Sequence, residues 1–411
     1  MRCIGLVLLW LALAAPSPLD DALANHRYPI ELDHAGKLAG KGADVLRPAL
    51  AAATFVMLGE DHGIAQIPSF GASLCRELAP AGLHTLALEV GPSVAPELAA
   101  FASARDGAAR EAAFTRKFPE TIAFYDWREE LAMLQACAQA AAPGKLQIWG
   151  LDQELMGSPV FVLHEILDTK PGPAARAAIA ALVRDDAAAH AAAAKTGDYG
   201  KLWLLTAKQD TLDAAAAALA KDGSPEAQQL FASLLESRAI YLGQSGPDPY
   251  LSNRRRAKLM KRTFLDDLSA AVKADKTFPK VLVKLGAWHL YRGLNPLRSA
   301  ELGNLLGEAA EGHGFEAVNI AIVGVKGKQL AVQGVGRAPK PVPLDLTKND
   351  DVKWLAPLFA AADAKGWTLF DLRALRTHFR RLGALDPELE RLIFGYDFLV
   401  MIPDPQPEHP R

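Results

Sequence analysis

Ionisable residues follow several apolar runs of this 411-residue chain, at the points where those runs end. The run 54–58 leads into Gly59-Glu60-Asp61-His62-Gly63, and the runs 85–88, 146–151 and 280–288 are followed by Glu89, Asp152 and His289. Histidine can act as a general base near neutral pH, and a neighbouring carboxylate can orient its ring. We therefore expect a catalytic group made of Glu60, His62, Glu89 and His289.

The apolar runs predict the strands that must position this group. They are continuous rather than alternating, which is typical of strands buried on both faces of a parallel sheet. Helical patterns lie between them, at 69–78, 92–104 and 127–141. The alternation predicts an α/β fold, with a mostly parallel central sheet flanked by helices. Ligands bind outside the carboxyl ends of such strands, so the ionisable residues would face one cleft.

The middle of the chain departs from this alternation. Residues 155–250 contain no run typical of a strand and are rich in alanine, the residue with the highest intrinsic helix propensity. We interpret them as an inserted helical subdomain or cap between the first part (25–154) and the second part (251–404) of the catalytic domain. The prolines of 337–345 predict a connector, and residues 405–411 are expected to form a loose tail.

Three further residues are candidates for substrate binding. Arg256 lies in a basic run that is expected to be helical, and an arginine facing the cleft would bind a carboxylate or phosphate, or stabilise an oxyanion. Asp152 follows one of the predicted strands. Trp127 would form a wall of the cleft or, alternatively, pack in the core.

The N-terminus has the pattern of a signal peptide. Arg2 precedes a short apolar run, and Ala12-Leu13-Ala14 and Ala22-Leu23-Ala24 both have the spacing of a cleavage site. The run is shorter than the ~20 residues of a membrane span. We predict that residues 1–24 are removed, and that the mature protein is periplasmic or secreted and has no membrane span. Cys75 and Cys137 could form a disulfide there.

Charge and motifs argue against several classes of function. The net charge of −2 lacks the basic excess that nucleic-acid binding would require, and it points to no particular oligomeric state. The sequence contains no CxxC pair, no HExxH zinc motif, no phosphate-binding P-loop and no GxSxG nucleophile elbow. A serine hydrolase of the usual α/β type is therefore not expected.

Taken together, these motifs resemble the erythromycin-esterase-like family over about residues 54–404, apart from the alanine-rich insertion. The resemblance rests on the order of its pieces: 58–63, 85–89, Trp127 with Glu130, 148–153, 256–260, Trp288-His289, 302–306, 370–373 and 396–402. It implies a hydrolase without cofactor that cleaves a small-molecule ester or lactone. In that family a histidine activates water, and the residues implied here are Glu60, His62, Glu89 and His289.

The first turn also resembles two related branches. The esterases usually carry two residues between the glutamate and the histidine, whereas only Asp61 intervenes here, as in the ChaN-type haem-uptake proteins and the TIKI-type proteases. One alternative is therefore a metal-dependent hydrolase or peptidase, with a divalent transition metal held by His62, Glu60, Glu89 and His289. The other is a haem- or iron-binding uptake protein.

Overall fold

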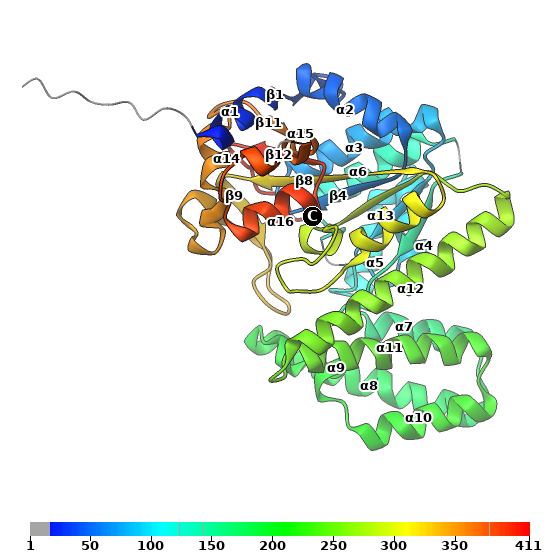
Figure 1. Cartoon of the computed structure of the whole chain (residues 1–411). Helices are drawn as coiled ribbons and strands as arrows, with labels where there is room; N and C mark the ends of the chain where they lie inside the picture. Colours follow the sequence, from blue (N-terminus) through cyan, green and yellow to red (C-terminus); the bar gives the residue numbers. More distant parts are fainter. Residues whose placement is uncertain (1–16, 123, 143, 378) are drawn as a thin grey trace, which may run out of the picture.

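An eight-stranded sheet forms the centre of the protein (Figure 1). The structure, a computed structural model, describes residues 17–122, 124–142, 144–377 and 379–411; residues 1–16, most of the predicted signal peptide, lie outside the described residues. The strand order is β1-β11-β12-β8-β4-β7-β5-β6. All pairs from β12 to β6 are parallel, and β11 is antiparallel to both neighbours. The predicted α/β fold with a mostly parallel sheet is confirmed.

The strands of this sheet are three to nine residues long, and all except the edge strand Arg27–Pro29 are mostly buried. They are β1 (Arg27–Pro29), β4 (Ala53–Glu60), β5 (Thr85–Leu88), β6 (Gln147–Gly150), β7 (Val281–Gly286), β8 (Glu316–Gly324), β11 (Thr368–Asp371) and β12 (Phe398–Ile402). Alternate residues of β4 enter two different apolar clusters, with Val56 and Leu58 on one face and Phe55 and Met57 on the other. Both faces are covered, which explains why the strands read as continuous apolar runs.

Helices cover both faces of the sheet. The first cluster includes residues of α2 (Lys41–Ala52), α3 (Gln66–Leu78), α4 (Ala95–Ser103) and α6 (Arg128–Ala140). The second includes residues of α1 (Pro18–Asn25), α12 (Pro249–Asp275), α13 (Leu302–Gly312), α14 (Ala356–Ala361), α15 (Leu372–Thr377) and α16 (Pro387–Gly395). The helix α5 (Gly107–Lys117) follows α4 and packs against it.

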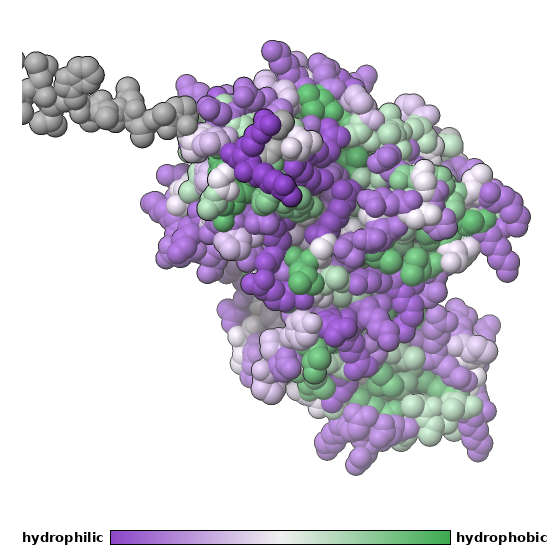
Figure 2. Space-filling model, viewed as in Figure 1, coloured by the Kyte–Doolittle hydropathy of each residue, from purple (hydrophilic) through white to green (hydrophobic). Residues whose placement is uncertain are grey.

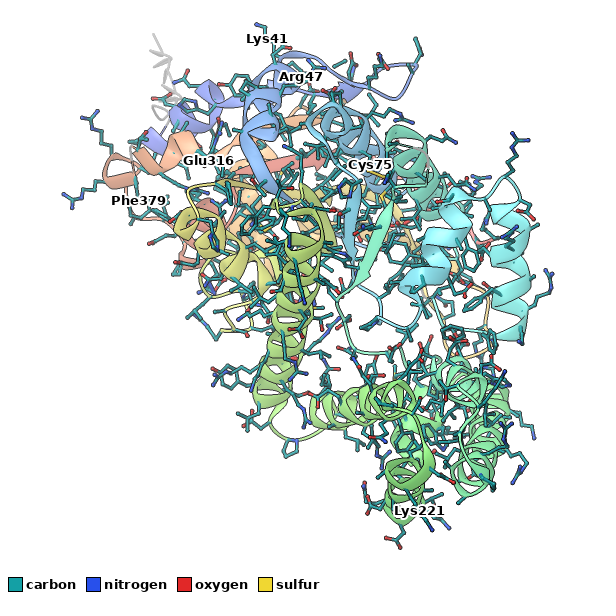
Figure 3. The ribbon with its side chains drawn as sticks, turned by 90° about the vertical axis from the view of Figure 1, so that its right-hand side faces the viewer. Lys41, Arg47, Cys75, Lys221, Glu316 and Phe379 are labelled. Carbon is teal, nitrogen blue, oxygen red and sulfur yellow. A yellow bond between two sulfur atoms is a disulfide. The ribbon has the colours of Figure 1, made fainter. Side chains whose placement is uncertain are left out.

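Residues 155–250 form helices that extend away from the sheet (Figure 1). They are α7 (Pro159–Asp168), α8 (Pro173–Thr196), α9 (Trp203–Thr206), α10 (Gln209–Asp222) and α11 (Pro225–Gln244). The long helix α12 leads from this group back to the sheet, and in the turned view Lys221 marks the far end of the helical group (Figure 3). Near the start of α12, the buried hydroxyl of Ser252 donates a hydrogen bond to the carbonyl oxygen of Ile240 in α11. Further along α12, Phe264 belongs to the second apolar cluster, which covers one face of the sheet.

A two-stranded ribbon lies beside the main sheet. It pairs β9 (Lys326–Ala331) with β10 (Lys340–Asp345), so the connector predicted for 337–345 is wrong for its last six residues, which form a strand. Proline is tolerated in a strand that pairs on one side only. Pro341 and Pro343 are two residues apart, so both of their nitrogens face the same edge of β10. Because the ribbon has only two strands, the edge of β10 that lies away from β9 has no partner strand in the ribbon.

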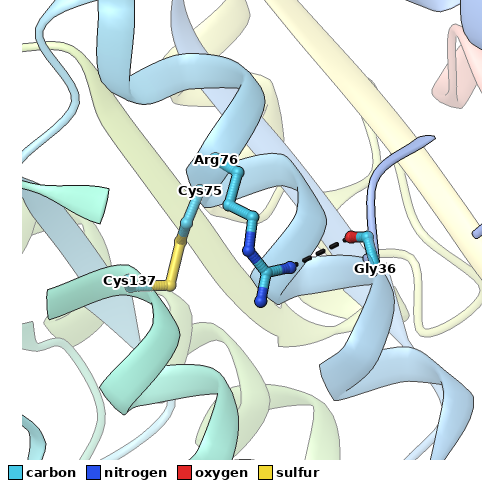
Figure 4. Close-up of a disulfide and its surroundings, with 4 residues drawn as sticks. All are labelled: Gly36, Cys75, Arg76 and Cys137. Atoms are coloured by element: carbon cyan, nitrogen blue, oxygen red, sulfur yellow. Dashed lines mark hydrogen bonds between the residues drawn. A yellow bond between two sulfur atoms is a disulfide. The ribbon is translucent and has the colours of Figure 1, made fainter. Parts of the chain in front are cut away.

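A disulfide joins two of the helices on one face of the sheet. Cys75 of α3 and Cys137 of α6 are bonded, with their Cα atoms 5.1 Å apart (Figure 4). The neighbouring Arg76 donates a hydrogen bond to the carbonyl oxygen of Gly36, at 3.0 Å. The pairing that the sequence allowed is therefore present in the structure.

The C-terminal residues are bound to the body of the protein, contrary to the loose tail expected for 405–411. Pro407 and Pro410 form isolated bridges with Ile64 and Trp127. The backbone N–H of Glu408 donates to Gly63, and Glu408 is 2% exposed. Prolines favour an extended backbone. Here the extended backbone pairs with the turn after β4 and with the residue at the start of α6.

Hydrophilic residues cover most of the face shown in Figure 2, with apolar residues in small separate groups. Within the described ranges, none of the helices combines the length and the apolarity that crossing a membrane requires.

Candidate active site

Four neighbouring strands bring the predicted site residues to one edge of the sheet. In the order β4-β7-β5-β6 these strands are parallel, so their carboxyl ends lie together. Strand β4 ends at Glu60, β5 ends just before Glu89, and Asp152 comes two residues after β6. His289 lies in a short 3-10 helix, η3 (Ala287–Leu290), directly after β7.

His62 lies between two carboxylates. Its Nδ1 is 3.3 Å from Oε1 of Glu60, and its Nε2 is 3.8 Å from Oε2 of Glu89. The ring of Phe124 stacks on the imidazole, with centroids 4.3 Å apart and planes 5° from parallel. The side chain is 29% exposed. His62 is thus held from three sides and still reaches solvent.

The turn that carries His62 depends on Gly63. Its φ of +84° lies in the left-handed region, and a Cβ there would lie 2.1 Å from the carbonyl oxygen of Leu330. The Gly63 carbonyl accepts a hydrogen bond from Leu330 N–H at 2.8 Å. Only glycine allows this close contact with the β9 strand.

Lys284 lies behind Glu60 in the buried strand β7. Its Nζ is 2.5 Å from Oε1 of Glu60 and 2.7 Å from Oε1 of Glu130, and Lys284 is 1% exposed. Burial alone would raise the pKa of Glu60, but Lys284 and His62 outweigh it and hold that pKa below its usual range. Burial would likewise lower the pKa of Lys284, and the two carboxylates hold it well above its ordinary value. Glu60 is therefore kept ionised beside His62.

Glu89 stands at the centre of the group. Its Oε2 accepts a hydrogen bond from the backbone N–H of Gly286 at 2.6 Å, and its Oε1 accepts one from Arg256 at 2.8 Å. His289 Nε2 lies 3.5 Å from the same Oε1. Burial opposes the charge, but His289, Arg256 and His62 hold the pKa of Glu89 well below its ordinary value. One ionised carboxylate thus contacts both histidines.

The two histidines differ in their surroundings. His289 has carboxylates on both ring nitrogens, with Nδ1 3.3 Å from Oε2 of Glu301, which is 2% exposed. Burial lowers the pKa of His289, yet Glu89 and Glu301 outweigh it and raise that pKa to about 9. For His62, burial also lowers the pKa, but Glu60 and Glu89 outweigh it and raise that pKa above 6.5. At neutral pH, His289 is therefore a cation.

A cavity of about 270 Å³ opens at this edge of the sheet. His62, Glu89, Arg256 and Asp152 line it, together with Phe124 of the segment before α6 and Tyr241 of α11. The helical insertion therefore contributes to the wall. Small-molecule sites commonly occur where strand ends meet a second structural unit.

Arg256 and Asp152, predicted as substrate-binding residues, both line this cavity and bind each other. The guanidinium donates from Nε to Oδ1 at 2.9 Å and from Nη2 to Oδ2 at 2.5 Å, and the same Nη2 contacts Glu89. This two-pronged pairing fixes the plane of the guanidinium. Trp127 is 2% exposed and does not line this cavity; its ring meets Phe124 edge-on, with centroids 5.2 Å apart.

The carboxylates of the site already have partners. Glu60 accepts a hydrogen bond from Lys284, and Glu89 accepts hydrogen bonds from Arg256 and the backbone N–H of Gly286. A metal ion bound to these oxygens would compete with two positively charged side chains. Across the described part of the chain, no group of three or more His, Cys, Asp and Glu side chains is arranged to hold a metal.

Several residues of the site are not predicted as site residues from the sequence, although one of them, Glu130, belongs to the family resemblance. They are Lys284, Glu130, Glu301, Phe124 and Tyr241. Lys284 leaves a signal in the sequence, because it is the one charged residue of the apolar run 281–288. A lysine in a buried strand requires a buried anion nearby. The others lie on helices and loops whose placement depends on the fold.

No protein-family model and no curated protein sequence matches the chain. Three solved structures share its fold. A Bacillus cereus protein aligns with a TM-score of 0.59 at 16% identity, covering 96% of this chain and 98% of its own. A succinoglycan biosynthesis protein aligns at 0.56 and 16%, with the same coverage.

The third structure is a histidine-to-asparagine variant of the erythromycin esterase EreC in its open conformation. It aligns with a TM-score of 0.63 at 17% identity and covers 93% of this chain and 98% of its own. The protein therefore shares the fold of these three proteins over nearly its whole length.

Proposed function

We propose that the protein is a hydrolase that cleaves an ester or lactone with water activated by His62. One observation carries the proposal: each nitrogen of a partly exposed imidazole lies beside a different ionised carboxylate at the wall of a cavity. A neutral imidazole oriented by a carboxylate at one nitrogen presents a proton acceptor at the other.

In the proposed reaction, Nε2 of His62 accepts a proton from water as the water oxygen attacks the carbonyl carbon. Glu60 stabilises the imidazolium that forms, because it lies beside Nδ1. The carbonyl π electrons move to oxygen and give a tetrahedral oxyanion. When this intermediate collapses, the carbon–oxygen bond to the alcohol breaks, and the leaving oxygen takes the proton from His62. The products are a carboxylic acid and an alcohol.

Two fixed cations would stabilise the oxyanion. Arg256 lines the cavity, and its orientation is set by Asp152 and Glu89. His289 does not line the cavity itself but lies 3.5 Å from Glu89, and Glu89 and Glu301 keep it protonated. Positive groups that are already in place stabilise developing negative charge without reorganisation. Glu89 has a positioning role, since it bridges Arg256, His289 and the Gly286 N–H.

The pairing of Lys284 and Arg256 with the site carboxylates supports chemistry without a metal. The shared fold with an erythromycin esterase supports the choice of ester or lactone over other bonds. A small-molecule substrate is in keeping with a cavity of about 270 Å³.

We also propose that the protein is exported. The N-terminal pattern supports this, and so does the Cys75–Cys137 bond, because disulfides persist in oxidising compartments. Leu19 and Leu23 of α1 are buried in the core next to the sheet. Cleavage after Ala14 would keep this helix, whereas cleavage after Ala24 would remove it. Mass spectrometry of the mature N-terminus distinguishes the two sites and would reveal an uncleaved chain.

A panel of esters, lactones and peptides tests the proposed function, using protein purified without a metal-affinity step. We expect hydrolysis of at least one ester or lactone that persists in a chelator. Elemental analysis and an absorbance spectrum of the same sample cover the alternatives. A stoichiometric transition metal with chelator-sensitive turnover would support the metallohydrolase, and a Soret band without turnover would support haem uptake; either result contradicts the proposal.

A further inference from the structure

A second cavity, of about 320 Å³, adjoins the first. Phe124, Leu155 and Met156 line both. Phe124 is also the residue whose ring stacks on His62. The second cavity therefore shares part of its wall with the cavity that His62 lines.

Three parts of the chain build this second cavity. Trp127 comes from the segment before α6, Tyr199 from the helical insertion, and Val332 and Pro339 from the tip of the β9–β10 ribbon. The ribbon tip is tied to the insertion, because Val335 N–H donates to Gly197 at 3.3 Å. The walls are thus held in place before a ligand arrives.

The ribbon tip is fixed by further contacts. Arg337 donates to the carbonyl oxygen of Thr196 at 3.0 Å, and the N–H of Gly336 donates to the Glu120 carboxylate at 2.5 Å. The side chain of Val335 is fully buried against Ala193 and Leu202. An apolar pocket that is already formed loses little conformational entropy when an apolar group enters it.

The chemistry of the second cavity is mainly apolar. Apolar and aromatic side chains in its lining include Phe124, Met156, Val332 and Pro339, and Val332 is 44% exposed. Three charged residues line it. Arg337 bonds Thr196, and Glu120 bonds Gly336 and lies 3.7 Å from His190. The third, Asp126, is partly buried, and burial raises its pKa to about 6, which brings its carboxyl closer to the neutral form at neutral pH. Desolvation of an apolar group is therefore the main interaction that this cavity offers.

We infer that the second cavity binds the apolar acyl or alkyl part of the ester whose carbonyl lies at His62. This inference rests on the proposed function and narrows its substrate class to esters with a sizeable apolar group. Each cavity alone lies near the lower end of the size range of small-molecule sites, whereas the pair can accept a substrate of ordinary drug size.

Chain-length series test the inference. The probes are p-nitrophenyl acetate and octanoate, which vary the acyl group, and methyl and octyl acetate, which vary the alkyl group. In at least one series we expect kcat/KM to rise by on the order of tenfold or more with the longer chain, because each buried methylene contributes to binding. Equal values in both series would overturn the inference and leave the proposed function standing.

Two variants locate the effect. Val332→Trp and Pro339→Trp place bulk at residues that line only the second cavity. We expect each to lower kcat/KM for the longer ester by about tenfold and to leave the shorter one within about twofold. Leu251→Trp, at a 62% exposed position on α12 that lines neither cavity, is the control. If both cavity variants keep the wild-type preference for the longer ester, the assignment of the apolar group to the second cavity is contradicted.

Failure of the proposed function would be recognised separately. If no ester of either series is hydrolysed, calorimetry with octanamide measures binding in the wild type and in Val332→Trp. Binding that the variant abolishes would support an apolar site without esterase activity. Absence of binding in the wild type would overturn the inference as well.

Discussion

The Nζ of Lys284 lies 2.5 Å from Oε1 of Glu60, buried near the carboxyl ends of β7 and β4. A second carboxylate, Glu130, shares the same ammonium group. Buried charges are tolerated only when they are paired with opposite charges. Removal of Lys284 would leave the carboxylates of Glu60 and Glu130 without this cation in a medium of low dielectric constant.

Lys284→Met should therefore destabilise the fold strongly. Breaking a buried ion pair by removing one partner costs about 3–5 kcal/mol. Denaturant unfolding measures the change in the free energy of unfolding. Lys273→Met makes the same chemical change at an exposed position and should have little effect. A small loss in Lys284→Met would show that Glu60 and Glu130 do not depend on this cation.

The rate of hydrolysis should depend on pH as a bell-shaped curve. His62 must be neutral to accept a proton, so activity rises as pH increases through its pKa, which Glu60 and Glu89 hold above 6.5. His289 must be protonated, so activity falls as pH increases through about 9. The measurement is kcat/KM against pH.

His289→Asn should remove the falling limb and lower the plateau. His313→Asn, at an exposed position, is the control and should keep the wild-type curve. An unchanged alkaline limb in His289→Asn would assign that limb to another group.

Gly286→Ala should block the site without disturbing the fold. A Cβ at this position would lie 3.3 Å from Oε2 of Glu89 and 3.4 Å from Nε2 of His62, and the backbone there has an ordinary φ of −50°. The added methyl would occupy the space beside the proton-accepting nitrogen. We expect a loss of about 100-fold or more in kcat, with little change in melting temperature.

The matched control is Gly312→Ala, where a Cβ meets no atom within 4 Å. Full activity of Gly286→Ala would show that the attacking water does not approach His62 from this side.

Glu408 should make stability fall with rising pH. Burial, with Glu130 close by, raises the pKa of Glu408 from 4.5 to about 10. Its contribution is fully present below the unfolded-state value near 4.5 and is lost as pH increases through about 10, because the unfolded chain ionises first. Glu408→Gln should therefore show a smaller drop in melting temperature between pH 5 and pH 9 than the wild type. Glu390→Gln is the exposed control, and an equal drop in Glu408→Gln would contradict the assignment.

The sheet could be predicted in large part from apolar runs, because strands buried on both faces need apolar residues at every position. The runs 54–58 and 85–88 correspond to β4 and β5. The strand β1 is three residues long and has no apolar run, and β11 has only two apolar residues, Leu369 and Phe370, so neither has a pattern that can be recognised. They exist because their backbones pair at the edge of a sheet that other strands have already formed.

The site could be predicted in part for a similar reason. The carboxyl ends of neighbouring parallel strands lie at the same edge of a sheet. Glu60, His62 and Glu89 at or just after such ends are therefore expected to lie close together, regardless of how the loops fold. The contacts of Phe124 and Glu408 depend on how a loop and the C-terminal segment fold back onto the turn after β4. No local sequence pattern encodes such long-range packing.

The most direct test of the account is the hydrolysis rate of His62→Asn beside that of the wild type, on the best ester or lactone of the panel. His34→Asn, at an exposed position, is the control, and the melting temperatures show whether the fold is kept. We predict that His62→Asn keeps the fold and loses about 10²–10⁴-fold in kcat, the usual contribution of a general base. A folded His62→Asn protein with wild-type kcat would contradict the central claim.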